Sequence, residues 1–279
     1  AKEKKYAVGC YNAINLDMAR GIIKAAENEN SPVILCHAEV HFKYTPIEKI
    51  APILLNEAVT AKVPVAVMLD HGKSFNAIIK AMKLGFNAVM YDGSDLTYDE
   101  NVRKTKEIVR IARALDVAVE AELGHVVRPK SAGAEGEEDD SSVGDEMLYT
   151  NPTQAFEFIK ETDADALAVA FGTVHGLYLK EPKLDFERLC DINERLKVPL
   201  VMHGGSGLPE EDIRNSIENG ICKINYYTGM AVKAAEKVKE MLMLSNSNIF
   251  YHNLMITAID SFCDEVSKTM KLFGSTGKA

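Results

Sequence analysis

Short apolar runs alternate with amphipathic segments along most of the chain. Eight of these runs are short, continuous and rich in Val, Ile, Leu and Ala, which is typical of parallel strands buried on both faces. They span residues 7–11, 33–36, 65–69, 88–91, 117–123, 166–170, 200–202 and 221–224. Between them, apolar residues recur at three- and four-residue steps, as in NAIIKAMKLG, which predicts helices. Eight strand–helix units can close on themselves, so the pattern predicts an α/β fold, a (β/α)8 TIM barrel.

Two segments depart from this alternation. After the eighth run, GMAVKAAEKVKEMLML and NLMITAIDSFCDEVSKTMKLFG predict extra C-terminal helices, which could cover one end of the barrel or join subunits. Residues 124–145 follow the fifth run and are polar and acidic, with the sequence AGAEGEEDD within them. A loop of this length is either functional or a solvated, mobile insertion, and its composition leaves both readings open.

Composition favours one domain over residues 1–279, because 47% hydrophobic residues can fill a single large core. The net charge is −9 and no basic face is evident, which argues against a nucleic-acid partner. Neither a signal peptide nor an apolar run of about 20 residues is present, so we expect a cytoplasmic protein with no membrane partner. Five cysteines without a CxxC pair predict reduced, mostly buried thiols.

Three histidines stand at the ends of apolar runs. His71, His175 and His203 close VPVAVMLDH, ALAVAFGTVH and VPLVMH. The carboxyl ends of parallel strands meet at one rim, where α/β enzymes hold their reactive groups. Three imidazoles with an open fourth position are the ligand set of a catalytic zinc, so the sequence predicts a zinc site there. The other four histidines lack this position and are expected to be satisfied internally or exposed.

Carboxylates lie close to these histidines in the sequence. Asp70 precedes His71, and at the end of a strand both side chains can reach the rim, although an aspartate there can also be a simple cap. Glu120 and Glu122 in VEAEL share one face of the fifth run. Two buried carboxylates need a cation, and either zinc or a lysine or arginine could supply it.

Glycine-rich turns follow the sixth and seventh runs. His175 is followed by Gly176, and His203 opens HGGSG, beside KINYYTG at the end of the eighth run. Glycines let the backbone approach a ligand closely, and N–H groups at the start of a helix can donate to a phosphate. Barrels often bind phosphate after strands seven and eight, although tight turns alone would also explain the glycines.

Six motifs in this order resemble the class II, zinc-dependent fructose- and tagatose-bisphosphate aldolase family over nearly the whole chain. They are DHG at Asp70, EAELG at Glu120, EED at Glu137, GTxHG at Gly172, HGGSG at His203 and KINxxT at Lys223. The resemblance implies a barrel that reversibly joins dihydroxyacetone phosphate to an aldehyde through a zinc-stabilised enediolate. It places zinc on His71, His175 and His203, with Glu122 as a further contact. Cobalt, iron or manganese are alternatives, and a monovalent cation could lie near the phosphate.

The resemblance also assigns the other site residues. Glu138 matches the base that removes a proton from the donor, which makes residues 124–145 a mobile active-site loop, and Glu137 is its alternative. Asp70 matches the residue that exchanges a proton with the aldehyde oxygen. The residues that match substrate and phosphate contacts are Asn12, Gly176, Gly204, Ser206, Asn225 and Thr228.

Two departures from the family pattern concern the aldehyde. Ala38, followed by Glu39, stands where members commonly have a serine that touches phosphate. Members that handle bisphosphates use a late arginine, whereas the last arginine here is Arg214. We therefore expect an aldehyde other than glyceraldehyde 3-phosphate. By the same resemblance the protein is expected to be a homo-oligomer, a dimer or tetramer.

Two other functions remain open at the level of sequence. A zinc barrel can also be a hydrolase or a sugar-phosphate epimerase, since barrel and metal do not fix the reaction, and a hydrolase would not depend on Glu138. A non-catalytic sugar-phosphate-binding barrel would account for the changes at Ala38, Glu39 and Tyr227.

Overall fold

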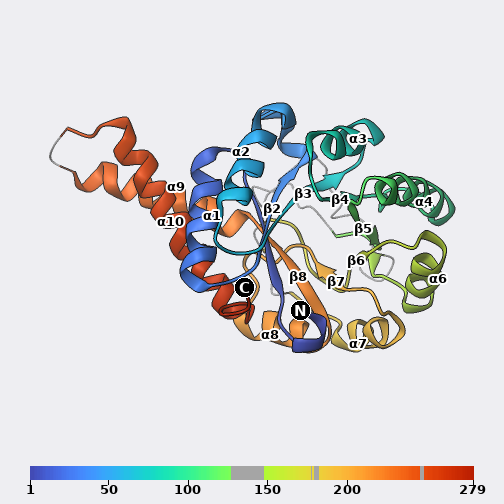
Figure 1. Ribbon diagram of the computed structural model, residues 1–279. Helices are drawn as coiled ribbons and strands as arrows, with labels where there is room; N and C mark the ends of the chain where they lie inside the picture. Colours follow the sequence, from blue (N-terminus) through green and yellow to red (C-terminus); the bar gives the residue numbers. More distant parts are fainter. Residues whose placement is uncertain (127–147, 177, 179–181, 246–247) are drawn as a thin grey trace.

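The computed structural model describes residues 1–126, 148–176, 178, 182–245 and 248–279. Eight parallel strands pair in sequence order and close into a barrel, since β8 pairs with β1 (Figure 1). The strands are β1 (Val8–Asn12), β2 (Val33–Ala38), β3 (Val65–Gly72), β4 (Ala88–Tyr91), β5 (Ala118–Leu123), β6 (Ala166–Val169), β7 (Leu200–Met202) and β8 (Ile221–Tyr226). The predicted TIM barrel is thus confirmed.

Helices form an outer ring around the strands (Figure 1). They are α1 (Leu16–Glu29), α2 (Ile47–Thr60), α3 (Phe75–Leu84), α4 (Tyr98–Ala114), α6 (Pro152–Thr162), α7 (Phe186–Arg195), α8 (Glu210–Glu218), α9 (Thr228–Leu244) and α10 (Tyr251–Leu272). Polar side chains cap the N-termini of several helices. Asn15, Ser74 and Thr97 each accept a hydrogen bond from a backbone N–H of the first turn of α1, α3 and α4. The chain then leaves α3 through Gly85, whose φ of 100° suits glycine.

The alternation of side chains along each strand creates two apolar layers. One layer lies between strands and helices and contains most of the buried residues. The other fills the barrel itself and includes Cys10, Cys36, Met68 and Met90. Because successive residues of a strand face opposite sides, Met90 points into the barrel and Tyr91 points outward toward the helices.

The C-terminal helices α9 and α10 form an arm that projects from the barrel (Figure 1). The inner part of α10 packs along α1, and Val266 and Met270 are fully buried. At the outer end of the arm large apolar side chains are exposed. The prediction of extra C-terminal helices is confirmed.

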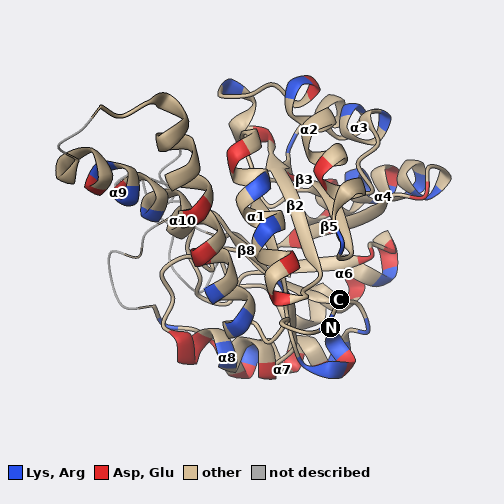
Figure 2. Cartoon of the chain, turned by 60° about the vertical axis from the view of Figure 1, so that its left-hand side comes forward, with Lys and Arg blue, Asp and Glu red and all other residues tan. Residues whose placement is uncertain are grey.

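Charged side chains lie mainly on the outer helices, where acidic and basic residues are interspersed in the view of Figure 2. Four of the five cysteines are buried, Cys190 is partly exposed, and all five are free thiols, as expected. In the described part of the chain, no helix combines the length and the apolar character needed to cross a membrane.

Candidate metal centre and active site

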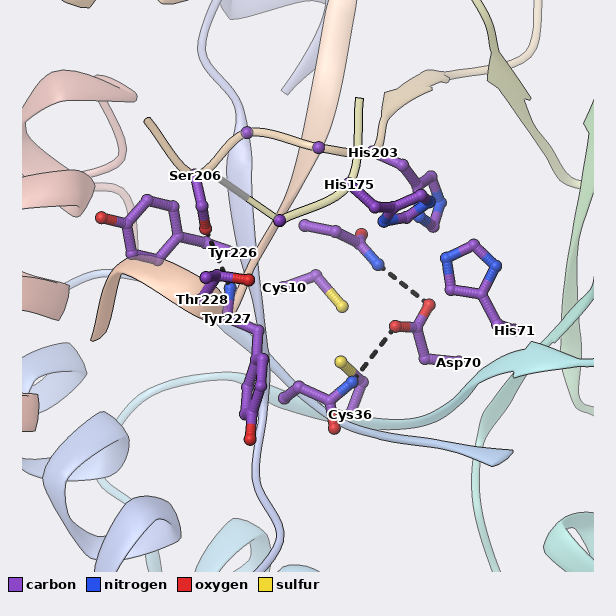
Figure 3. A pocket seen from close by; sticks show the side chains of 15 residues that line it. Cys10, Cys36, Asp70, His71, His175, His203, Ser206, Tyr226, Tyr227 and Thr228 are labelled. Atoms are coloured by element: carbon purple, nitrogen blue, oxygen red, sulfur yellow. Dashed lines mark hydrogen bonds between the residues drawn. The ribbon is translucent and has the colours of Figure 1, made fainter. Parts of the chain in front are cut away.

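Three histidines predicted from the sequence meet at the carboxyl end of the barrel (Figure 3). One ring nitrogen from each of His71, His175 and His203 lies within 4.8 Å of the others. Their ring centroids are 4.5 to 5.8 Å apart. The structure differs from the expected placement at one position: His175 lies in the connection after β6, which ends at Val169, and not at the end of the strand itself.

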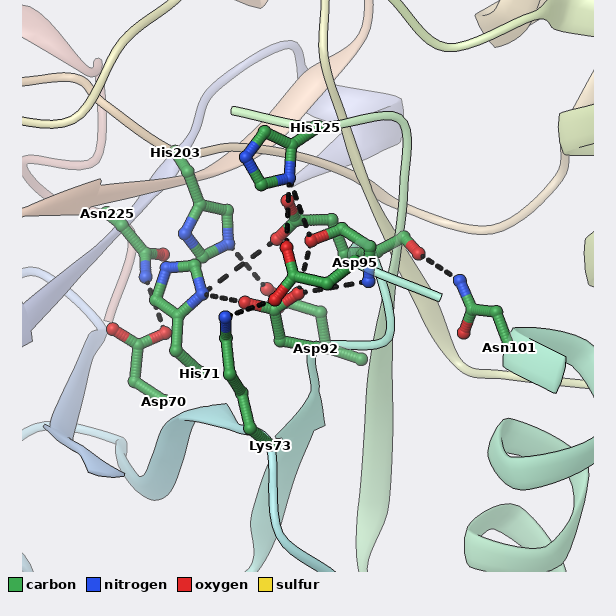
Figure 4. Close-up of polar contacts among 12 residues, drawn as sticks. Asp70, His71, Lys73, Asp92, Asp95, Asn101, His125, His203 and Asn225 are labelled. Carbon is green, nitrogen blue, oxygen red and sulfur yellow. Dashed lines mark hydrogen bonds and ion pairs between the residues drawn. The ribbon is translucent and has the colours of Figure 1, made fainter. Parts of the chain in front are cut away.

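Two buried carboxylates orient two of these rings. Nδ1 of His71 lies 2.9 Å from Oδ2 of Asp92 (Figure 4), and Nε2 of His203 lies 3.0 Å from Oε1 of Glu120. The contact with Glu120 leaves Nδ1 of His203 buried with no hydrogen-bond partner among the described residues. A buried polar atom without a partner is costly, and metal-binding histidines characteristically bond a carboxylate through their second nitrogen. This arrangement fits a metal ion on the three imidazoles.

The two glutamates of β5 have different partners. Oε2 of Glu120 forms an ion pair of 2.9 Å with Nζ of the buried Lys223. Oε2 of Glu122 lies 3.9 Å from Nδ1 of His71. Of the two readings of VEAEL, the lysine partner therefore applies to Glu120, whereas Glu122 lies beside a candidate metal ligand. Burial alone would raise the pKa of Glu120, but the charge of Lys223 and the contact with His203 hold it below its usual value.

Asp70 lies in the same pocket and is held by two amides. Its Oδ1 accepts a hydrogen bond of 2.9 Å from Nδ2 of Asn225, and its Oδ2 accepts one of 3.3 Å from Nδ2 of Asn12. Burial alone would raise the pKa of Asp70, but the neighbouring His71, His203 and Lys223 outweigh that effect and lower the pKa. Asp70 is therefore an oriented carboxylate whose charged form is favoured.

A local irregularity lets the neighbours Asp70 and His71 face one pocket. In a regular strand they would point to opposite sides. Here the pairing of β3 with β4 shifts register between Leu69 and Gly72, and His71 has a φ of 42°. A left-handed residue other than glycine costs roughly 1–3 kcal/mol, and residues under such strain recur at functional sites. The register shift and the left-handed turn at His71 redirect its imidazole to the rim.

Lys223 links the part of the site around Asp70 to the part around His203. Besides its ion pair with Glu120, its Nζ donates a hydrogen bond of 2.6 Å to Oδ1 of Asn225. Asn225 in turn holds Asp70, and Glu120 holds His203. Although burial opposes the charge, Cys10, Glu120 and Asp70 raise the pKa of Lys223, so its ammonium stays protonated. One buried cation thus orders both a carboxylate and a candidate metal ligand.

The remaining predicted contacts line the same pocket. Gly176, Gly204, Ser206, Asn225 and Thr228 all border it together with Asp70 and the three histidines. Gly204 has a φ of 72°, and an added Cβ would lie 2.3 Å from the carbonyl oxygen of Val174. α9 begins at Thr228, so the first turn of a 17-residue helix borders the pocket. Such a helix start offers N–H groups to an anion.

Glu39 is turned away from the centre of the pocket. Its Oε2 accepts hydrogen bonds from the backbone N–H groups of Lys73 and Ser74, at 2.7 and 3.1 Å. Its Oε1 accepts one of 2.6 Å from the hydroxyl of Ser74. The carboxylate therefore caps the N-terminus of α3, a favourable position for a negative charge.

Sequence reasoning missed Asp92 as a partner of His71. The signal was the acidic residue that directly follows the fourth apolar run, in YDGS. Asp92 also accepts a hydrogen bond of 2.6 Å from Ser94, whose Oγ lies 3.3 Å from Nδ1 of His125 (Figure 4). Both Glu137 and Glu138 lie in residues 127–147, outside the described residues.

The barrel and this pocket define a TIM-barrel protein with a candidate three-histidine metal centre at the carboxyl end of its strands. Residues 1–278 match the family described as "Fructose-bisphosphate aldolase class-II". The chain belongs to this class II aldolase family.

Relatives agree with that membership over the whole chain. The fructose-bisphosphate aldolase of Staphylococcus aureus (strain Mu50 / ATCC 700699) is 37% identical over 283 residues, covering 100% of this chain and 96% of the relative. The uncharacterized protein YdjI of Escherichia coli (strain K12) is 38% identical over 279 residues, with the same coverage. The crystal structure of the E. coli YdjI aldolase superposes with a TM-score of 0.85 at 35% identity, covering 100% of this chain and 95% of that one.

Proposed function

We propose that this protein is a metal-dependent class II aldolase that cleaves a ketose phosphate to dihydroxyacetone phosphate and an aldehyde, and catalyses the reverse condensation. The observation that carries the proposal is the convergence of three imidazoles and the oriented carboxylate of Asp70 in one pocket. The activity named for the S. aureus relative agrees with it.

His71, His175 and His203, with Glu122 beside them, would hold zinc, and cobalt, iron or manganese are alternatives. Bound zinc would polarise the donor carbonyl and stabilise the negative charge that develops during the reaction, a contribution of several kcal/mol. Asp92 and Glu120 fix the ring orientation of two ligands before any metal arrives. A monovalent cation near the phosphate is a further expectation from the family.

Asp70 would take the proton of the C4 hydroxyl during cleavage and return it to the aldehyde oxygen during condensation. A base must be unprotonated and correctly aimed. The lowered pKa of Asp70, in which burial is outweighed by His71, His203 and Lys223, meets the first condition. The hydrogen bonds from Asn12 and Asn225 meet the second.

Glu138 is proposed as the base that removes a proton from the donor carbon, with Glu137 as its alternative, on an active-site loop over residues 124–145 of a single domain. The donor phosphate would bind at the start of α9 and the adjoining turns. Five residues are assigned to this phosphate: Gly176, Gly204, Ser206, Asn225 and Thr228. Asn12 would contact the substrate while it holds Asp70.

The aldehyde is proposed to lack the phosphate of glyceraldehyde 3-phosphate. Ala38 lies directly beside Asp70 in the β2–β3 register and offers no side-chain hydrogen bond there. Arg214 lies on α8, where it is exposed and pairs with Glu210, so it is not a pocket residue. Among described residues, no arginine lines the pocket to bind a second phosphate.

The proposal is tested by measuring release of dihydroxyacetone phosphate from fructose 1,6-bisphosphate and from ketose monophosphates. We expect the higher kcat/KM for a monophosphate, and a preference for the bisphosphate by orders of magnitude would contradict the aldehyde assignment.

Asp70→Asn should lower kcat about 10²- to 10⁴-fold while the metal content is kept. The exposed Asp99→Asn variant is the matched control. An Asp70→Asn enzyme within a few-fold of wild type would contradict the catalytic role.

A further inference from the structure

A second cavity lies on the outside of the barrel, between α3 and α4. Its volume is about 220 Å³, and its lining includes Tyr91 from the end of β4 and Phe75 from the start of α3. Because β4 alternates, Met90 faces the barrel interior, and Tyr91 faces this cleft instead. The cavity is therefore separated from the histidine pocket by the barrel wall, and the two share no lining residue.

The side chain of Tyr91 lines this cavity. The residue is only 3% exposed. No hydrogen bond joins it to any residue that the structure describes. The hydroxyl is not one of the buried polar atoms that lack a partner, so water can reach it and it is available to donate to a ligand atom in the cavity.

Two cations on α4 border the same cavity. Arg103 and Lys104 form no ion pair or hydrogen bond within the described chain. Many other helical cations do pair, for example Lys80 with Glu48 and Arg113 with Asp163. Glu107 lines the cavity one turn further along α4 but pairs with neither cation, so positive charge remains in excess.

The rest of the lining is apolar or already neutralised. Lys73 forms an ion pair with Asp95, which leaves the charge of α4 as the main attraction for an anion. Phe75, which is 45% exposed, offers apolar surface to a carbon skeleton, whereas Ile108, which also lines the cavity, is only 1% exposed. Cations beside apolar walls and a tyrosine hydroxyl form the usual composition of a site for a small organic anion.

We propose that this cleft binds the oxyanion group, phosphate or carboxylate, of a small organic molecule that carries hydroxyl groups. Arg103 and Lys104 pair with the oxyanion, and the Tyr91 hydroxyl donates to it. The carboxylate of Glu107 would repel the oxyanion itself. It instead accepts a hydrogen bond from a hydroxyl group of the ligand. The site is independent of the aldolase reaction proposed above.

The test is calorimetric titration of the metal-loaded full chain with inorganic phosphate and, separately, with succinate. Arg103→Gln/Lys104→Gln is expected to weaken binding at this cleft about tenfold or more, because two charge-assisted hydrogen bonds are lost. Lys106→Gln/Arg110→Gln removes the same charges from exposed positions of α4 that do not line the cavity, and should bind as the wild type does. Tyr91→Phe should weaken binding several-fold without changing the charge.

The two oxyanions separate the ligand classes, since saturation by phosphate or by succinate identifies the group that the cleft accepts. Binding in the histidine pocket is distinguished because it persists in Arg103→Gln/Lys104→Gln. If neither oxyanion shows a site that is lost in Arg103→Gln/Lys104→Gln and kept in the Lys106→Gln/Arg110→Gln control, the proposal is overturned.

Discussion

At the scale of single residues, Lys223 is the buried charge on which the site depends most. Its ammonium pairs with Glu120 and donates to Asn225. Lys223→Met would leave a buried carboxylate without its cation, which costs about 3–5 kcal/mol. Because Glu120 would also hold His203 less firmly, metal affinity should fall about 10- to 100-fold. Urea unfolding and a metal competition titration measure the two effects.

Lys233→Met is the control for that change, since it removes an exposed ammonium that pairs with Glu236 on α9. We expect its unfolding midpoint and metal affinity to match the wild type. A Lys223→Met protein that also matches the wild type in both measurements would refute the role given to the buried network.

His41 should make the protein sensitive to acid. Burial and the nearby His37 lower its pKa from 6.5 to about 4. Between these values the unfolded chain takes up a proton that the folded chain refuses, so stability is full above pH 6.5 and falls as the pH drops toward 4. The loss between pH 7 and pH 5 should be about 2 kcal/mol. Denaturant unfolding at both pH values measures it.

His41→Asn should remove most of this pH dependence, because an amide does not titrate. The amide can still donate to Oδ1 of Asn12, which Nδ1 of His41 contacts at 3.0 Å, so the local structure is kept. The exposed His252→Asn variant should keep the wild-type dependence. Equal slopes in His41→Asn and the wild type would show that other groups cause the acid sensitivity.

The sequence was enough to predict the candidate metal ligands and Asp70 individually, but not the residues that contact them in the fold. Asp70, His71 and His203 follow apolar runs, and that position alone places them at the rim. Asp92 and Lys223 carry equally visible charges, yet their roles depend on which strand lies opposite. The same holds for Glu39, which caps a helix that begins 36 residues further along the chain. Spatial pairing of this kind leaves no periodic signal in one sequence.

At the scale of elements, the eight strands were predictable and the irregular connections were not. Apolar runs predicted every strand, because strands buried on both faces are mostly apolar, although β5 and β8 also contain the buried Glu120, Glu122 and Lys223. The turn at His71 and the position of His175 beyond β6 depend on local backbone strain and on glycines. Sequence periodicity describes regular structure, so it could indicate that these histidines converge but not how the chain turns them inward.

A substitution at Gly204 tests the connection that carries His175. Gly204→Ala would place a Cβ 2.3 Å from the Val174 carbonyl oxygen, next to His175. We expect the loop that carries His175 to shift, with weaker metal binding and a lower melting temperature. Thermal unfolding and metal titration measure both.

Gly277→Ala is the matched control for Gly204→Ala. Its φ of 73° is nearly the same, but no atom lies within 4 Å of the added Cβ. It should cost only the left-handed strain of roughly 1–2 kcal/mol and leave metal affinity unchanged. Similar metal affinities for the two variants would contradict the proposed contact.

At the scale of the whole molecule, the α9–α10 arm presents an apolar end, where Met243, Leu244 and Tyr251 are each more than 70% exposed. Clustered exposed apolar side chains mark interaction surfaces. We propose that the protein is a homo-oligomer, a dimer or tetramer, joined through this arm. Met243→Glu/Leu244→Glu should shift it toward monomers in sedimentation-velocity experiments. Val59→Glu, at an 85% exposed apolar position on α2, is the control, and a monomeric wild type would contradict the proposal.

The proposed function requires that metal on His71, His175 and His203 activates the C–H bond of dihydroxyacetone phosphate. The most direct measurement follows that proton signal by NMR in deuterated buffer, with metal-loaded and chelator-treated protein, because this half-reaction needs no aldehyde. We predict exchange that requires the metal and persists without acceptor. Absence of exchange in protein that holds one metal per site would contradict the claim.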